Sequence, residues 1–190
     1  GVIEKWFYVG MQQKGRIGFS GGTCFTNPGS VCIGDIAKFS SIACTGSAGG
    51  IWDMGDGTPL LDAVNFQHWY IYDTAETFTV TMYDKEMCTP TSQAITVNPP
   101  PIASFTESIA AGCPGTNVTF TDVSTPGPSS AAITGWDWQF NDNSNSISTA
   151  QNPVNDYLSP GVYNPYLEVT DANGCKSTTA NTFQIGDSAI

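Results

Sequence analysis

Short runs of alternating apolar and polar residues recur along the chain and predict β-strands. In FTVTM, Phe78, Val80 and Met82 fall on one face, and VTFTD (118–122) and WDWQF (136–140) keep the same period of two. The runs AITV and YLEV follow this pattern as well. Clusters of Gly, Pro, Asn and Asp separate the runs, and no stretch keeps a helical period. The pattern therefore predicts an all-β sandwich.

The order of the apolar positions repeats once along the chain. Three pairs of blocks align: VCIGDIAKFSS (31–41) with GCPGTNVTFTD (112–122), IWDMGDG (51–57) with DWQFNDN (137–143), and 72–88 with 157–175. In these blocks Trp52 matches Trp138, and Tyr72 matches Tyr157. The agreement of order and spacing predicts two copies of one β-rich unit.

Three consecutive prolines, Pro99 to Pro101, separate the two copies. Proline donates no ladder hydrogen bond and favours an extended, semi-rigid spacer. We therefore expect a first domain at 21–98, a linker at 99–101 and a second domain at 102–190. Residues 1–20 form an N-terminal extension, in which EKWFYVGM either adds an edge strand to its own unit or completes the sheet of a neighbouring subunit.

The composition narrows the classes of function. The chain has 190 residues, only 12% of them charged, and a net charge of −11. Because the chain is acidic and has no basic cluster, it is not expected to bind the negatively charged backbone of nucleic acids. No apolar run is long enough to span a bilayer, and Gly1 in place of Met indicates a processed start or a fragment.

Six cysteines, none in a Cys-x-x-Cys pair, predict three disulfides and an oxidising compartment outside the cytoplasm. A single His argues against a zinc site. Since Cys32 matches Cys113 and Cys88 matches Cys175, the simplest pairing places one bond inside each unit. The expected bonds are Cys32–Cys88, Cys113–Cys175 and, in the first unit only, Cys24–Cys44.

The turn WDMGDG contains two carboxylates, which raises the alternatives of a calcium site and a structural turn. The second copy keeps Asp142 as the match of Asp56 but has Gln139 in place of Asp53, so the carboxylate pair is not retained. Asp side chains fix such turns by bonding backbone N–H groups two residues on. A calcium ion is coordinated by six or more oxygen ligands. We interpret Asp56 and Asp142 as structural turn residues, expect no cofactor, and keep calcium as the weaker alternative.

Other polar and aromatic positions suggest weaker sites. His68 has no second His or Cys nearby, and no Gly-x-Ser-x-Gly elbow is present, so no catalytic residue is expected. Trp69 and Tyr70 are candidates for a sugar-stacking surface, with packing beneath a loop as the alternative. Candidate glycosylation sites are Asn117 in the sequon NVT, and Thr74 and Ser188 in short Asp-Ser/Thr motifs.

The blocks WDMGDG, Tyr72 and FTVTM in the first copy, and WQFNDN, Tyr157, GVY and LEVTDANGC in the second, resemble the PKD domain. This family has an immunoglobulin-like β-sandwich fold. The ending DANGC is similar to cysteine-containing repeats of large secreted surface proteins of Bacteroidota. The second copy departs from the Gly-Asp-Gly turn, with Asn141 and Asn143 replacing both Gly.

The resemblance implies a non-enzymatic, extracellular or cell-surface protein. We expect an adhesin segment or filament subunit whose partners are neighbouring domains or copies of itself, with glycans as further candidate ligands. The alternative is a carbohydrate-binding accessory part of a secreted hydrolase. The expected mechanical role depends on a stiff linker and on a disulfide inside each unit.

Overall fold

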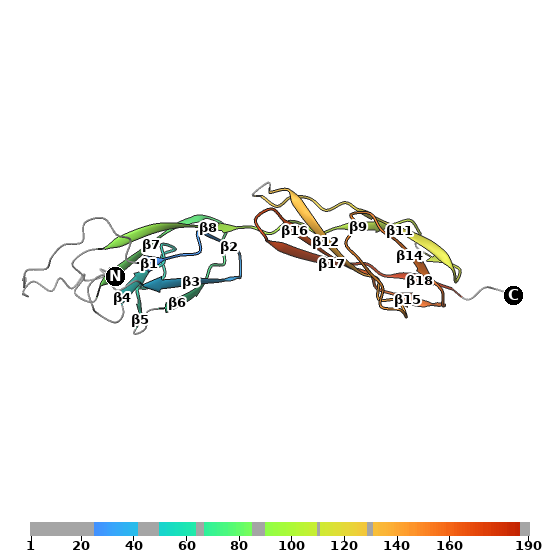
Figure 1. Ribbon diagram of the computed structural model, residues 1–190, viewed down its shortest axis with the longest axis horizontal. Coiled ribbons are helices and arrows are strands. Elements are labelled where there is room, and N and C mark those ends of the chain that lie inside the picture. Colours follow the sequence, from blue (N-terminus) through green and yellow to red (C-terminus); the bar gives the residue numbers. More distant parts are fainter. Residues whose placement is uncertain are drawn as a thin grey trace, which may run out of the picture.

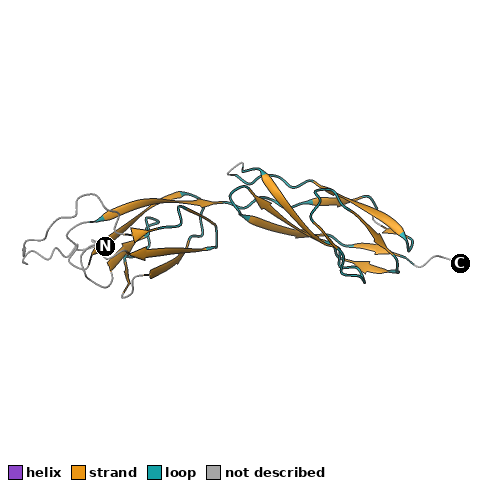
Figure 2. Cartoon of the chain, viewed as in Figure 1, coloured by secondary structure: helices purple, strands orange, loops and turns teal. Residues whose placement is uncertain are grey.

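A computed structural model describes residues 25–41, 50–63, 67–84, 90–109, 111–128 and 131–186. This part of the chain consists of strands and connecting loops without a helix (Figure 2). The all-β fold predicted from the alternating pattern is therefore confirmed. No helix that could cross a membrane occurs among the described residues.

The first unit contains two sheets that face each other across a hydrophobic core. One has the order β1-β3-β6 and the other the order β2-β8-β7-β4-β5. Their strands are β1 (Phe25–Thr26), β2 (Ser30–Cys32), β3 (Ile36–Ser41), β4 (Gly50–Asp53), β5 (Leu61–Ala63), β6 (Gln67–Ile71), β7 (Thr77–Asp84) and β8 (Thr91–Asn98).

The second unit repeats this arrangement with shorter strands and three hydrogen-bonded sheets. Their orders are β14-β11-β9, β10-β18-β15 and β13-β12-β16-β17. The strands are β9 (Phe105–Glu107), β10 (Ala111–Gly112), β11 (Thr116–Asp122), β12 (Ile133–Gln139), β13 (Ile147–Ser148), β14 (Val154–Tyr157), β15 (Gly161–Tyr163), β16 (Tyr166–Asp171), β17 (Lys176–Ala180) and β18 (Phe183–Ile185).

Each unit has its own hydrophobic core, and the two clusters share no residue. Trp52 is 1% exposed at the centre of the first and Trp138 is 0% exposed at the centre of the second. In FTVTM and VTFTD, the side chains that the alternating pattern places on the inner face are buried. The buried members of these runs are Phe78, Val80, Met82, Val118 and Phe120.

A buried tyrosine closes each core in the same way. The Tyr72 hydroxyl donates to the Met54 carbonyl at 3.1 Å, and the Tyr157 hydroxyl donates to the Phe140 carbonyl at 3.1 Å. Burial raises the pKa of both phenols, so each stays a neutral donor. These bonds tie the chain after β4 and after β12 to the facing sheet.

The two units lie end to end, joined where β8 continues into β9 (Figure 1). The connection is held against the second unit. Ile102 and Thr125 exchange two backbone hydrogen bonds of 2.9 Å, and Pro101 is buried. Gly127 lies so close to the Pro100 carbonyl that any Cβ there would clash with it. The prolines are thus packed onto the second unit at this point.

Candidate functional site

Cys32 lies at the end of the first unit that faces the second. β2 pairs in parallel with β8, which places Cys32 opposite Asn98, the last residue of β8. The backbone N–H of Ile33 then donates to the Asn98 carbonyl at 3.0 Å. Because Asn98 leads directly into the prolines, Cys32 is held at the junction of the two units.

Cys175 approaches the same point from the second unit, in the turn between β16 and β17. The Asp171 carboxylate organises this turn. Its Oδ1 accepts hydrogen bonds from the backbone N–H groups of Asn173 (2.9 Å) and Cys175 (2.8 Å). The Asp171 N–H donates in return to the Cys175 carbonyl at 2.9 Å. Asp171 is 2% exposed and Cys175 is 1% exposed, so both are buried at the junction.

Cys32 and Cys175 form a disulfide that joins the two units, with their Cα atoms 5.5 Å apart. The bond connects residues 143 positions apart in the sequence. Together with the peptide connection through the prolines, it gives the junction two covalent links. Disulfides persist in oxidising compartments, which agrees with an extracellular location.

This bond overturns the pairing expected from the repeat. Cys32 is bonded to Cys175 and not to Cys88, and Cys113 is an exposed free thiol and not the partner of Cys175. The mechanical role that depended on one disulfide inside each unit is therefore wrong in that form. Cys24, Cys44 and Cys88 lie outside the described residues, so the pairing Cys24–Cys44 stays a prediction.

The physical reason is the length of β8. Cys32 lies opposite the end of this eight-residue strand, whereas Cys88 precedes its start by three residues. The eight residues of β8 separate its two ends by roughly 25 Å. The three residues from the start of β8 back to Cys88 can shorten the distance to Cys32 by at most about 10 Å. A disulfide needs Cα atoms within about 7 Å. A bond between Cys32 and Cys88 is therefore out of reach.

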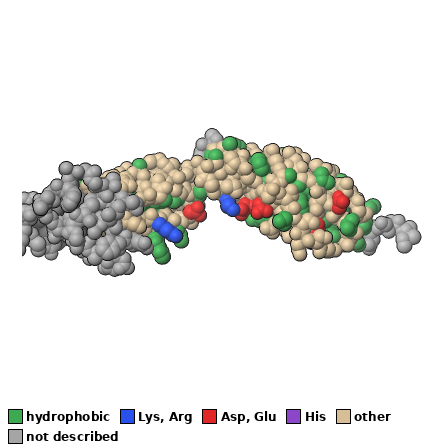
Figure 3. Space-filling model, in the orientation of Figure 1, with side chains coloured by type: hydrophobic (Ala, Val, Ile, Leu, Met, Phe, Trp, Pro, Cys, Tyr) green, Lys and Arg blue, Asp and Glu red, His purple; other side chains and the backbone are tan. Residues whose placement is uncertain are grey.

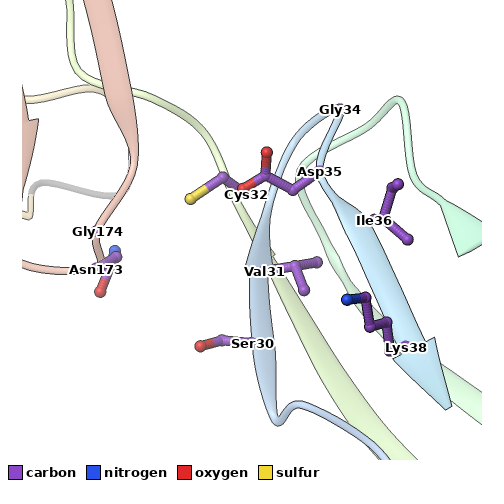
Figure 4. Close-up of a pocket in the computed structure, with 9 residues that line it drawn as sticks. All are labelled: Ser30, Val31, Cys32, Gly34, Asp35, Ile36, Lys38, Asn173 and Gly174. Carbon is purple, nitrogen blue, oxygen red and sulfur yellow. The ribbon is translucent and has the colours of Figure 1, made fainter. Parts of the chain in front are cut away.

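An open groove of about 640 Å³ lies beside the disulfide. Figure 4 shows residues of the first unit, among them Asp35, Ile36 and Lys38, on one side and Asn173 and Gly174 of the second unit across from them. In Figure 3 the molecule is hollowed along this edge, and Lys side chains gather there with Asp and Glu.

The outer face of β3 and β6 continues this groove with apolar side chains. Lys38 is paired with Trp69 and Ile36 with Ile71 in the antiparallel ladder. Trp69 is 63% exposed, Ile71 54% and Ile36 52%. We call Ile36, Lys38, Trp69 and Ile71 the junction surface. It combines one large aromatic ring with aliphatic side chains and a cation.

Tyr70 does not belong to this surface. Neighbouring residues of a strand point to opposite faces, and the Tyr70 ring packs edge-on against Tyr72 at 4.8 Å, toward the core. Its hydroxyl donates to Asp56 Oδ2 at 2.6 Å. The two aromatic residues considered together as a sugar-stacking pair therefore lie on different sides of β6, and only Trp69 faces solvent.

The two turn aspartates make closely related hydrogen bonds. Asp56 Oδ1 accepts from the Thr58 N–H at 3.0 Å, and Asp142 Oδ1 accepts from the N–H groups of Ser144 (3.1 Å) and Ser146 (2.8 Å). Partial burial of Asp56 opposes its ionisation, but hydrogen bonds from Tyr70 and Thr58 outweigh burial and lower its pKa.

The pKa of Asp142 is lowered in the same manner. Its partial burial would raise the pKa, but the hydrogen bonds from the Ser146 N–H and from the Asn155 amide outweigh it. Asn141 adopts the left-handed conformation with φ 48°, which lets the turn persist without the glycine of the first copy. Both carboxylates are thus engaged by their own turns.

The described residues contain no cluster that could hold a metal ion. No group of three or more His, Cys, Asp and Glu side chains lies close enough there to hold a metal ion. The His68 ring stacks on Trp52 with centroids 6.0 Å apart, and burial lowers its pKa. His68 therefore packs against the first core and faces no carboxylate partner in the described structure.

The candidate glycosylation residues lie on different parts of the molecule. Asn117 is exposed on β11, where it pairs with Asp156 of β14, and Thr74 is exposed between β6 and β7. Ser188 and the stretch EKWFYVGM lie outside the described residues. Modification at Asn117, Thr74 and Ser188 stays a prediction.

These features define an all-β sandwich protein. Residues 98–185 match the model of the PKD domain family. No curated protein was found to match the chain.

Several solved structures resemble parts of the chain. The PKD1 domain of Vibrio anguillarum Epp is 25% identical, covers 47% of this chain and 96% of its own, and has a TM-score of 0.40. The PKD1 domain from the Vibrio cholerae metalloprotease PrtV is 25% identical, with 46% and 98% coverage and a TM-score of 0.40. A structure concerned with carbohydrate-binding modules of the β-sandwich superfamily is 27% identical, with 47% and 36% coverage and a TM-score of 0.43.

Proposed function

We propose that the chain is a non-catalytic, extracellular structural and interaction module, used as a segment of a surface adhesin or as a fibre subunit. It consists of two tandem PKD-type domains at 21–98 and 102–190, joined by the linker 99–101. Its role is to hold the two sandwiches in one fixed geometry and to present their surfaces to partners.

The observation that carries this proposal is the disulfide between Cys32 and Cys175. Two domains joined by one peptide connection reorient unless their interface is large. A second covalent link at the junction restricts that motion, and the packing of Pro100 and Pro101 near Gly127 restricts it further. A stiff pair of sandwiches suits a spacer or a fibre better than a soluble enzyme.

We expect the oxidised chain to tumble as one body. Backbone ¹⁵N relaxation should give the same rotational correlation time for both units. In the double variant Cys32→Ser, Cys175→Ser, both units should keep their spectra, while their correlation times fall toward that of a single unit. Cys113→Ser, which removes a cysteine outside the junction, is the matched control. Unequal tumbling of the two units in the oxidised native chain would contradict the proposal.

The second candidate function is carbohydrate binding as an accessory to a secreted hydrolase. It is favoured by the junction surface, in which Trp69 lies 63% exposed beside Ile71 and Ile36. An exposed aromatic ring on a flat sheet offers a stacking face for a sugar. The groove next to it gives room for a chain of sugars to continue toward the second unit.

We expect Trp69→Ala to weaken the binding of any polysaccharide that retains the native chain. Affinity electrophoresis against a panel of soluble polysaccharides measures this, with Leu158→Ala as the control because Leu158 is 73% exposed in the second unit. Loss of one stacked aromatic should cost about 1–1.5 kcal/mol, roughly tenfold in affinity. Equal retention of the native chain and of Trp69→Ala would remove this candidate, and so would retention of neither.

A further inference from the structure

The outer face of β3 and β6, which carries the junction surface, has a structural counterpart in the second unit. β3 pairs with β6, and β11 pairs with β14, in the same antiparallel register. The inward residues of β6 and β14 also correspond. The Tyr70 hydroxyl donates to Asp56 Oδ2 at 2.6 Å, and the Asn155 amide donates to Asp142 Oδ2 at 3.1 Å. The two outer faces are therefore built on the same backbone.

The outward side chains of these two faces differ in chemistry. All of them are exposed, so neither set fills a core. In ladder order, the four positions hold Ile36, Lys38, Trp69 and Ile71 in the first unit and Asn117, Thr119, Val154 and Asp156 in the second. The second unit forms its sandwich with small, polar or acidic residues at these places. The fold therefore does not require the large apolar side chains of the first unit.

The apolar side chains of the junction surface form one contiguous patch. Ile36 lies opposite Ile71, and Lys38 lies opposite Trp69, in neighbouring positions of the same ladder. Side chains paired in this way have Cβ atoms about 5 Å apart, so the four contact one another or a shared ligand. Soluble proteins leave such patches exposed mainly where they bind something. The difference between the two units therefore marks the junction surface as a binding surface.

Lys38 gives this surface a preference for negative charge. The Lys and Arg residues in the described part of the chain are Lys38 and Lys176, and Lys176 is paired with Glu168 at 2.6 Å. No ion pair among the described residues engages Lys38. Asp35 is the acidic residue nearest to it in sequence, and Figure 4 shows the Asp35 side chain at the other end of the groove, with Ile36 between them. A ligand carboxylate would thus meet an unpaired ammonium group beside an indole ring.

The charge and the size of the surface restrict the ligand further. The net charge of −11 repels a densely charged polyanion at long range. A sugar chain in which carboxylates alternate with neutral rings suits a surface that has one cation and one large aromatic ring. A stable protein interface needs about 800 Å² from each partner, more than four side chains on two short strands supply. These limits favour a sugar chain over a protein.

We propose that the junction surface binds a polysaccharide in which uronic acids alternate with neutral sugars. The Trp69 ring stacks on the face of one sugar, and the Lys38 ammonium donates to the carboxylate of the adjacent uronic acid. Ile36 and Ile71 cover the apolar side of the same stretch. This inference rests on the carbohydrate-binding candidate and names the class of its ligand.

The test is isothermal titration calorimetry of the full chain with hyaluronan oligosaccharides and with the same oligosaccharides after reduction of their carboxylates to alcohols. We expect the native chain to bind the charged form roughly fivefold more tightly, as one partly exposed ion pair supplies. Lys38→Gln should bind both forms with the same affinity. Trp69→Ala should weaken the binding of both forms roughly tenfold.

The second unit supplies a matched variant of the whole surface. Four substitutions copy its outer face onto the first unit, namely Ile36→Asn, Lys38→Thr, Trp69→Val and Ile71→Asp. Since the same residues already occupy the same ladder in the second unit, this variant should fold, which circular dichroism verifies. It should bind neither oligosaccharide. Leu158→Ala, in the second unit, should bind both as the native chain does.

Equal affinity of the native chain for the two forms would overturn the inference, and so would binding of neither form. A preference for the charged form that persists in Lys38→Gln would overturn it as well. Self-association of the native chain in sedimentation, lost in the fourfold variant, would show that a second copy covers the surface instead. The carbohydrate-binding candidate is decided separately, by retention of the native chain and of Trp69→Ala on the polysaccharide panel. Failure of the uronic acid preference and failure of that candidate are therefore distinguishable.

Discussion

Pulled by its two ends, the oxidised chain should extend to only about a quarter of the length that the reduced chain reaches. The disulfide encloses 143 positions of sequence, which at about 3.5 Å per residue hold about 500 Å of the roughly 660 Å total contour. Force applied at the termini passes from Cys32 through the bond to Cys175. Most of both cores lies inside the closed loop and carries no load until the bond breaks.

Single-molecule force spectroscopy measures this effect directly. The native chain should show a final extension of about 160 Å without reductant, and a further gain of about 500 Å after a reductant is added. The double variant Cys32→Ser, Cys175→Ser should reach the full length without reductant. Cys113→Ser should behave as the native chain does. Release of the full contour length from the oxidised native chain would show that the loop is not closed.

Trp138→Ala should destabilise the second unit by about 3–5 kcal/mol. Trp138 is 0% exposed, and its ring lies 5.1 Å from that of Phe105 and 5.6 Å from that of Phe120. Its Nε1 also donates to the Ala150 carbonyl at 2.9 Å, and that acceptor would lose its partner. Such a loss is a large share of the 5–15 kcal/mol that typically stabilises a domain.

The two hydrophobic clusters share no residue, so the loss should be confined to one unit. Denaturation by urea, followed by NMR signals assigned to each unit, should show early unfolding of the second unit in Trp138→Ala and of the first unit in Trp52→Ala. Ile147→Ala is the control, because Ile147 is 73% exposed and its loss should cost less than about 0.5 kcal/mol. Simultaneous unfolding of both units in either tryptophan variant would contradict the separate cores.

Local patterns were sufficient to predict the strands and the side chains that fill the cores. A period of two separates inward from outward residues within each strand, which is why Phe78, Val80 and Met82 are buried as predicted. The same rule already separates Trp69 from Tyr70, since neighbours in a strand cannot share a face. That signal was present in the sequence, and the paired interpretation of these two aromatics overlooked it.

The disulfide at the junction was not predictable from those patterns. A repeat makes Cys32 equivalent to Cys113 and Cys88 equivalent to Cys175, but equivalence does not say whether a bond forms within a unit or between units. That choice depends on which end of β8 lies beside Cys32, and the parallel pairing of β2 with β8 sets it. Asp171, which holds the turn of Cys175, was likewise not recognised, although an Asp that accepts N–H groups of its own turn is a local signal of the kind used for Asp56.

Peptide mapping of the native chain under non-reducing conditions tests the central claim most directly, because it reads the connection between the units from the protein itself. Digestion should yield one peptide pair that contains Cys32 and Cys175, and this pair should separate on reduction. Recovery of Cys32 with Cys88, or of Cys175 with Cys113, would contradict the doubly linked junction and the rigid geometry proposed for it.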